Sequence, residues 1–507
     1  MEPKLLFEKY ADKIDGVLHC YDRILISGNL HPFCYAAGMA GYLRAQGIRL
    51  FDYAKFAMPL REEIRLKAEA VAQAHQLKIE FIRKKTFRKE DRVQAILKTR
   101  GYAPGLVHIF SAMERCGSYL PWHDKATGKN MLKFADGKCL HYYFYFLDKD
   151  FGLCYLRVPT WCPFRLQFYC NGHAWLASQL TRRGIGYTLH DNAFLHIADY
   201  AKANRLADQF DAQKLHKKLD QWAAEYCPVI KPLQLTYHWN IWQAEYATDV
   251  IFKQRADLQA FYPQLLQTLI HTVHPEDIAT FLGRKLHGRF QGEIGSRFNT
   301  RVMGTRLKHQ MDSTALKAYD KFGQILRIET TTTDVTFFRH YREVSHRNGT
   351  TEKKWTSMKK SIYSLAPLRE CLGAANRRYL ELLSAIETPE VGVQCLAQVV
   401  ETKTEKDHRY KGFTLLAEEE VTLFRILLRG EFAISGMTSR ALHALFPQKT
   451  TGQISRLLKR LRVHGLLKKI GHHYKYYLTT LGRQIATMTL KLREMHIIPT
   501  LAQAMAA

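Results

Sequence analysis

In the first quarter of the chain, apolar stretches typical of buried strands alternate with stretches in which apolar side chains recur at helical spacing. Residues 17–27 and residues 105–113 are rich in apolar side chains, and stretches of this length predict buried strands. Between them, residues 59–75 repeat apolar side chains at helical spacing. Strands that alternate with helices predict an α/β domain with a partly parallel sheet, which we place at residues 1–135.

The pattern changes after residue 135 to closely spaced, aromatic-rich strands. Residues 141–169 alternate in this way, and Asp150-Phe151-Gly152 predicts a hairpin turn between two of the strands. The segment predicts an antiparallel extension of the sheet, in which the aromatic side chains either form core or stack on bases. Residues 198–290 are expected to be mainly helical, so we assign 136–300 to one region of aromatic strands and helices.

Residues 316–331 predict a second hairpin. A three-residue loop pairs Tyr319 with Arg327, and only this register separates an apolar face from a polar face. The side chains on the polar face are Lys317, Tyr319, Lys321, Arg327 and Glu329.

The polar face of this hairpin predicts phosphodiester chemistry. Nearby cations favour the phenolate form of a tyrosine, which can attack a phosphodiester, and a glutamate can hold the metal that polarises the phosphate. The expected catalytic residues are Tyr319 and Glu329, the latter also a metal ligand, and the expected nucleic-acid contacts are Lys317, Lys321 and Arg327. The arrangement K-x-Y-x-K followed by R-x-E resembles the hairpin of rolling-circle replication initiators, although no H-x-H motif lies nearby. The alternative is that Lys317 and Glu329 pair only as surface charges.

Two N-terminal acids are candidates for the same chemistry. Asp22 lies in the middle of the first apolar run, and Glu114 directly follows residues 105–113. Ligands gather at the carboxyl ends of parallel strands, and two-metal phosphodiester chemistry requires carboxylates on adjoining strands. We therefore predict Asp22 and Glu114 as catalytic ligands of a divalent metal, Mg2+ or Mn2+. The alternative is that Asp22 pairs with Arg23 or another buried arginine, and that Glu114 caps a turn.

The C-terminal fifth predicts a recognition helix followed by a basic wing. Apolar residues recur at helical spacing from Ile454 to Leu461, and the opposite face of the helix is cationic. Two short strands follow, with Gly471, His472 and His473 at their tip. Such an arrangement is typical of a helix in the major groove with flanking phosphate contacts. The expected nucleic-acid contacts are Arg456, Lys459, Arg460, Arg462, Lys468, Lys469 and Lys475.

Residues 411–507 resemble the winged helix-turn-helix of MarR-type regulators, with a short strand expected at 431–435 and a further helix at 439–445. The resemblance implies binding to DNA. An RNA-facing winged helix, a protein-binding one and a merely solvated basic helix are the alternatives. The charged stretch 391–410 is the expected linker, which leaves 301–390 for the second hairpin and a following helix.

Composition extends the expectation of an anionic partner to the whole chain. The 507 residues carry 75 Lys and Arg against 47 Asp and Glu, a formal charge of +28, so nucleic acid, DNA or RNA, is the leading partner. We find no run of about 18 apolar residues and no signal-peptide core, so we expect a soluble cytoplasmic protein without a membrane partner. The ten cysteines include no C-x-x-C pair, which indicates neither a zinc ribbon nor a disulfide framework. A homodimer is an open alternative to a monomer.

Taken whole, the chain resembles an uncharacterised bacterial family that occurs in several copies per genome, which implies a mobile element. These observations predict a nucleic-acid-binding protein that cleaves or transfers DNA strands with a divalent metal, as a transposase or replication initiator does. The competing hypotheses are a non-enzymatic transcriptional regulator of the MarR type and an RNA-binding component of a ribonucleoprotein.

Overall fold

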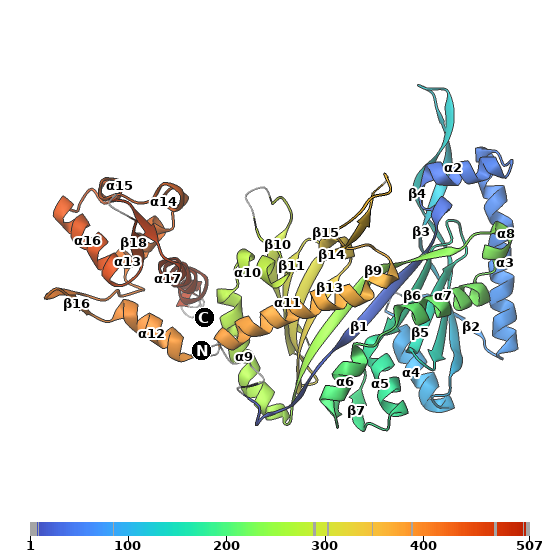
Figure 1. The fold of residues 1–507 in the computed structure, drawn as a ribbon, viewed down its shortest axis with the longest axis horizontal. Coiled ribbons are helices and arrows are strands. Elements are labelled where there is room, and N and C mark those ends of the chain that lie inside the picture. The colour runs from blue at the N-terminus through green and yellow to red at the C-terminus, as the bar shows by residue number, and fades with distance from the viewer. Residues whose placement is uncertain are drawn as a thin grey trace. The chain divides into compact units, whose positions relative to one another are not determined.

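The computed structural model describes residues 8, 10–84, 86–286, 290–301, 304–346, 348–386, 389–470, 474–499 and 501–502. The chain divides into two compact units, which Figure 1 shows as ribbons. The larger one, which we call the sheet unit, comprises Lys4–Pro263 and His274–Leu380. The smaller one, the C-terminal unit, is formed mainly by Glu381–Ala507.

One large sheet organises the sheet unit. Within the described ranges it has 11 strands in the order β10-β11-β12-β13-β9-β1-β6-β5-β4-β3-β2. The strands are β1 (Ile14–Leu30), β2 (Ile79–Phe81), β3 (Gly105–Asp124), β4 (Lys129–Asp148), β5 (Gly152–Pro159), β6 (Leu166–Asn171), β9 (Tyr237–Phe252), β10 (Ile294–Arg301), β11 (Gly304–Met311), β12 (Thr314–Lys321) and β13 (Ile325–Thr332). The paired neighbours are antiparallel except for β2 and β3. The mixed α/β class is confirmed, but the parallel part is confined to that one pair.

The pairing of β1 explains this difference. Ile24 of β1 faces Cys170 of β6 on one side and Ala244 of β9 on the other, so both partners lie far away in sequence. An apolar run predicts a strand but not its partner, because only the assembled sheet defines the register. One sheet therefore runs through the predicted ranges 1–135, 136–300 and 301–390, and those boundaries do not separate the compact units.

Helices cover parts of both faces of the sheet. In the sheet unit they are α2 (Ala36–Ala45), α3 (Tyr53–Ala74), α4 (Lys89–Arg100), α5 (Gly172–Arg182), α6 (Tyr200–Ala207), α7 (Ala212–Tyr226), α8 (Ile230–Leu233) and α10 (Pro275–Phe281). Two more helices, α9 (Arg255–Thr272) and α11 (Leu365–Ile386), begin in the sheet unit and end in residues of the C-terminal unit. Two hairpins stand beside the sheet, β7 (Tyr187–His190) with β8 (Ala193–Ile197) and β14 (Arg339–Ser345) with β15 (Thr351–Ser357).

The helices α7 and α11 lie on the same face of the sheet (Figure 1). Tyr226 of α7 stacks on Phe144 of β4, with 4.5 Å between the ring centroids, and Asn376 of α11 donates to Thr248 Oγ1 of β9 at 3.2 Å. The helix α4 packs on the opposite face, because it contacts Tyr143, the neighbour of Phe144 in β4. The face opposite α11 is the one that carries the charged residues described below.

The C-terminal unit is mainly helical. Its elements are α12 (Pro389–Val400), β16 (Lys403–Glu405), β17 (His408–Tyr410), α13 (Glu418–Leu427), α14 (Gly430–Ser435), α15 (Ser439–Leu445), α16 (Thr451–Val463), β18 (Leu467–Lys469), β19 (Tyr476–Leu478) and α17 (Thr480–Lys491). Thr450 caps α16 through a reciprocal pair of hydrogen bonds with Gln453. Ile454, Leu458 and Leu461 of α16 are buried in the core of this unit.

One local prediction for this unit is wrong. Residues 431–435 are helical in α14, and the strand pairing lies just beyond them, between Met437 and Tyr476. Residues 391–410, the expected linker, form most of α12 and the hairpin of β16 and β17. Short segments such as these carry too few periods for the hydrophobic pattern to distinguish a helix from a strand. The predicted wing tip, Gly471 to His473, lies outside the described residues.

Among the helices that the structure describes, none combines the length and apolar character needed to cross a membrane.

Candidate metal centre

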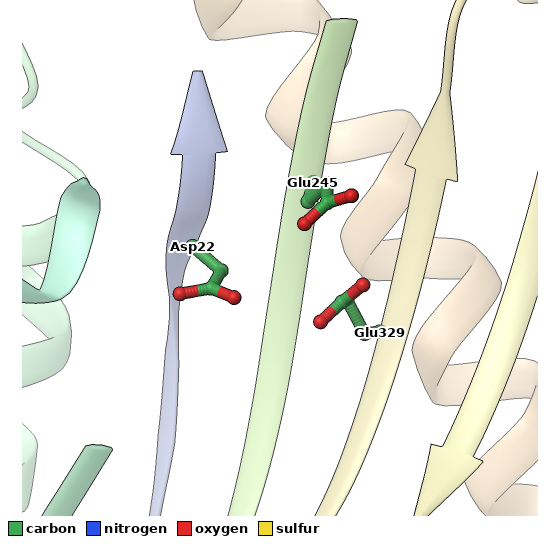
Figure 2. Close-up of side chains that lie close together, drawn as sticks. All are labelled: Asp22, Glu245 and Glu329. Carbon is green, nitrogen blue, oxygen red and sulfur yellow. The ribbon is translucent and has the colours of Figure 1, made fainter. Parts of the chain in front are cut away.

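Three buried carboxylates meet on neighbouring strands of the large sheet. Asp22 lies on β1, Glu245 on β9 and Glu329 on β13, and one oxygen of each lies within 4.8 Å of those of the other two. Figure 2 shows the three side chains turned toward one another. Between Tyr21 and Ile24 the pairing of β1 with β9 shifts in register, which places Asp22 in an irregular part of the strand, beside Glu245. We call these three residues the carboxylate cluster.

Asp22 is held from the side of β6 and α5. Its Oδ1 accepts hydrogen bonds from the side-chain amides of Asn171 at 3.0 Å and Asn192 at 2.8 Å, and lies 3.1 Å from Nδ1 of His173. Its Oδ2 lies 3.4 Å from the Arg327 guanidinium. Burial opposes ionisation of Asp22, but Arg327 and His173 outweigh it and hold the pKa of this carboxyl well below its ordinary value. Asp22 is therefore an anion.

The other two members of the carboxylate cluster share one lysine. Lys317 Nζ lies 2.5 Å from Glu329 and 3.5 Å from Glu245, and Arg23 lies 3.8 Å from the second oxygen of Glu245. Burial and the neighbouring charge of Glu329 raise the pKa of Glu245 above its ordinary value. The shared lysine does not remove the repulsion between the two glutamates, and a bound cation would reduce this repulsion.

Arg327 completes the buried network rather than facing a ligand. Its side chain is 0% exposed, and its Nε and Nη2 each donate to Asp249 of β9 at 2.6 Å. The negative charges of Asp249 and Asp22 raise the pKa of Arg327 well above its ordinary value although burial opposes this. The prediction that Arg327 contacts nucleic acid is wrong, because no phosphate can reach a fully buried guanidinium.

The two hairpin lysines are also engaged inside the protein. Lys317 is bound by the two glutamates, and Lys321 contacts the side-chain oxygen of Asn192. Burial, followed by the charge of Arg327, lowers the pKa of Lys321. The expected register, which pairs Tyr319 with Arg327, is confirmed, but both lysines of this face are already engaged by side chains of the protein.

The environment of Tyr319 differs from the one predicted. Its phenol donates a hydrogen bond to Glu329 Oε2 at 2.8 Å. Burial, together with the charge of Glu329, raises the pKa of Tyr319 well above its ordinary value. The expectation that nearby cations favour the phenolate is therefore wrong, because a buried carboxylate accepts the hydrogen bond of the Tyr319 hydroxyl and so favours the neutral phenol. Tyr319 positions Glu329.

Glu114 lies in a different group from the carboxylate cluster. The Tyr143 hydroxyl donates to its two oxygens at 2.7 and 2.8 Å, and Arg157 and Lys89 lie 2.8 and 3.7 Å from it. These partners lower the pKa of Glu114 against the effect of burial. Glu114 therefore does not share an ion with Asp22, since β3 is separated from β1 in the sheet by β4, β5 and β6.

Glu245 and Asp249, together with His173, were missed by the sequence prediction. Both acids lie on β9, which falls in residues 198–290, the range expected to be mainly helical. The alternation of Glu245, Ala247 and Asp249 in an otherwise apolar stretch has the period of two that places acids on one face of a strand, and this was the available signal. His173 follows a cap at Asn171 and offers no comparable pattern.

The predicted cations of the C-terminal unit fall into two classes. Arg460 donates to Glu420 at 2.8 Å and to the carbonyl oxygens of Lys411 and Gly412. Lys459 and Arg462 both pair with Glu405 of the β16–β17 hairpin. Three of the predicted contacts are thus used in part within the unit.

The other predicted contacts, Arg456, Lys468, Lys469 and Lys475, are exposed. Arg456 also lines a groove of about 550 Å³ between α16 and the β16–β17 hairpin, together with Lys411 and Lys449. Exposed cations beside a groove are available to an anionic partner.

The carboxylate cluster can hold a metal ion, since carboxylate oxygens are the ligands that hard divalent cations prefer. Comparison with family models, with curated proteins and with solved structures finds no match to this chain.

Proposed function

We propose that this chain is a nucleic-acid-processing protein in which the carboxylate cluster binds a divalent metal, Mg2+ or Mn2+, for phosphodiester cleavage or transfer. The observation that carries the proposal is the convergence of Asp22, Glu245 and Glu329 from three adjacent strands. A divalent ion held there would stabilise the charge that develops on the phosphate and on the attacking and leaving oxygens. The resemblance to a multi-copy bacterial family favours a mobile or replicating element as the setting.

The residues around the carboxylate cluster have supporting roles in this proposal. Tyr319 and Lys317 orient Glu329, and Asn171 and Asn192 orient Asp22 through hydrogen bonds. Such outer partners set ligand geometry, and their loss typically costs about 10- to 100-fold in metal affinity.

We further propose that the C-terminal unit acts as a winged helix that binds nucleic acid. The capped helix α16 followed by the β18–β19 hairpin has the element order of that motif. The exposed cations Arg456, Lys468, Lys469 and Lys475 would contact phosphates. DNA is the favoured partner and RNA is the alternative, and an assay that offers both nucleic acids distinguishes them.

The test combines metal binding with cleavage. Mn2+ should raise the melting temperature of the wild type, since a ligand bound only to the native state stabilises it by about 2.7 kcal/mol at 100 times its dissociation constant. The variant Glu245→Gln with Glu329→Gln should lose this shift, whereas Glu114→Gln should keep it. Labelled single-stranded and duplex DNA and RNA, incubated with Mg2+ or Mn2+ and run on a denaturing gel, should be cut by the wild type and not by the double glutamine variant.

Tyr319→Phe belongs in the same gel. Because phenylalanine cannot donate a hydrogen bond to Glu329, this variant should need a higher metal concentration for cleavage. It should form as much protein-linked label as the wild type. A covalent adduct that the wild type forms and Tyr319→Phe lacks would instead identify Tyr319 as the nucleophile.

A second candidate function is a nucleic-acid-binding regulator without chemistry. One observation favours it: the carboxylates of the cluster already have cationic partners in Lys317, Arg327 and Arg23. In that case the cluster is a structural ion-pair network, and Mn2+ shifts the melting temperatures of the wild type and of the double glutamine variant equally.

A further inference from the structure

The face of the sheet that carries the carboxylate cluster continues to a pocket. Arg23, Leu25 and Ser27 share this face, because β1 pairs regularly with β6 from Arg23 to Gly28. Arg23 lies 3.8 Å from Glu245, whereas Ser27 lines the pocket. At about 3.3 Å per residue, Ser27 lies about 13 Å along β1 from Arg23.

The pocket is cationic. Its lining includes Arg115, Arg157 and Arg165 but no carboxylate. Arg157 is held in place by Glu114 at 2.8 Å, while Arg115 and Arg165 are exposed. The volume is about 190 Å³. Sites for whole small molecules usually measure about 300–1,000 Å³, so this pocket suits one unit of an anionic polymer.

Aromatic rings border the same pocket. The Trp242 and Phe134 side chains line it and are 49% and 56% exposed. Trp161 is a third ring in the lining, and its Nε1 donates to Ser118 Oγ at 3.0 Å, which fixes its orientation. Exposed aromatic rings beside arginines are the combination that binds unpaired bases and their phosphates.

A row of side chains connects the pocket with the carboxylate cluster, beginning at Arg157 of the lining. The Arg157 guanidinium lies 5.9 Å from the Tyr143 ring, whose centroid lies 5.6 Å from that of Tyr155. Tyr155 and Tyr169 are stacked, with ring centroids 5.1 Å apart and an interplanar angle of 13°. The Arg23 guanidinium lies 5.9 Å from the Tyr169 ring and 3.8 Å from Glu245. The row therefore ends at a member of the carboxylate cluster.

We propose that this pocket binds one nucleotide of a single-stranded nucleic acid, with the arginines on its phosphate and Trp242 stacked on its base. The strand then passes over Tyr155 and Tyr169 to the carboxylate cluster. A duplex does not fit, because its bases are already stacked and paired. The inference deepens the proposed function, since it names the substrate form that the cluster would act on.

Binding is measured by fluorescence anisotropy in EDTA, with labelled oligothymidylate and oligouridylate as probes. Trp242→Ala should weaken binding about 5- to 150-fold, the usual loss for one base–aromatic stack. Arg115→Ala with Arg165→Ala should reduce the slope of log affinity against log salt by about 0.7 for each arginine that contacts a phosphate. The matched control, Arg44→Ala with Lys98→Ala, removes two exposed cations of the sheet unit that do not line the pocket and should leave this binding unchanged.

Photo-cross-linking gives a readout that does not depend on variants. An oligonucleotide that carries iodouridine should cross-link to Trp242, Trp161 or Phe134, as mapped by mass spectrometry of the full chain. Cross-links confined to residues outside the pocket, or wild-type affinity and salt slope in both pocket variants, would overturn the proposal. These binding assays contain no metal, so their failure would count against the pocket alone. Failure of the proposed function would look different, because the pocket would still bind the strand but no strand would be cut in Mg2+ or Mn2+.

Discussion

At the scale of single residues, burial decides what each charged side chain near the carboxylate cluster can do. Arg327 and Tyr319 both lie on the predicted polar face of the hairpin, and the predicted register is the observed one. Their roles differ from those predicted because Asp249, contributed by β9, accepts hydrogen bonds from Arg327, and Glu329 of the hairpin itself accepts one from Tyr319. A hairpin considered alone shows only its own side chains, whereas in the fold the neighbouring strand β9 adds Glu245 and Asp249 beside its polar face.

Arg327→Met tests the importance of the buried network. The substitution leaves Asp249 and Asp22 without their cation, so it should lower the free energy of unfolding of the sheet unit by about 3–5 kcal/mol. The measurement is urea unfolding followed by tryptophan fluorescence, since the seven tryptophans all lie in the sheet unit. Arg44→Met removes an exposed arginine and should change stability by less than about 0.5 kcal/mol.

The same pair has a defined pH dependence. The pKa of Asp249 is held well below 3.8, because Arg327 and a hydrogen bond from His173 outweigh the effect of burial. The unfolded chain therefore binds protons at a higher pH than the native state, and the wild type should lose stability as the pH falls below about 4. Arg327→Met should flatten this dependence between pH 5 and 3, and an unchanged slope would show that the pair does not control acid stability.

At the scale of elements, periodicity predicted the helix α16 and its buried stripe, and it did not predict which cations are free. Ile454 and Leu461 are buried as expected, because a 3.6-residue period defines the inward face. Arg460 lies on the outward face but contacts Glu420 of α13, and Lys459 contacts Glu405 of β16. Both acids come from other elements, so no local pattern could reveal them.

Exposed and paired cations of the C-terminal unit should therefore respond differently to substitution. Arg456→Ala with Lys468→Ala should lower affinity for duplex DNA and reduce the slope of log affinity against log salt by about 0.9 for each lost phosphate contact. Arg460→Ala should instead destabilise the unit by about 1–3 kcal/mol, since it removes hydrogen bonds to Glu420 and to two carbonyl oxygens. Filter binding over a salt series and far-UV circular dichroism separate the two effects. Equal salt slopes for all variants would contradict binding through this helix and hairpin.

At the scale of the whole molecule, the fold class and the basic character could be predicted, and the sheet order could not. Strands β13, β9, β1 and β6 follow one another directly in the sheet, although they come from segments spread over residues 14–332. Pairing of such distant segments is set by how the complete core packs, so each predicted domain contained only part of the sheet. For the same reason Asp22 and Glu329 were both predicted as metal ligands, whereas Glu245, which lies between them, was not.

The two sets of residues proposed to act on nucleic acid belong to different units and should act independently. Among the described residues, Glu245 and Glu329 share no hydrogen-bond partner with Arg456 or Lys468. Glu245→Gln with Glu329→Gln should abolish the Mn2+-dependent shift in melting temperature, followed by tryptophan fluorescence, and leave the affinity for duplex DNA unchanged. Arg456→Ala with Lys468→Ala should lower the affinity for duplex DNA and leave the Mn2+-dependent shift unchanged. In the combined variant the two effects should add within about 0.3–0.5 kcal/mol, as they do for sites that are not coupled. A larger interaction energy would mean that metal binding in the sheet unit and nucleic-acid binding in the C-terminal unit are linked.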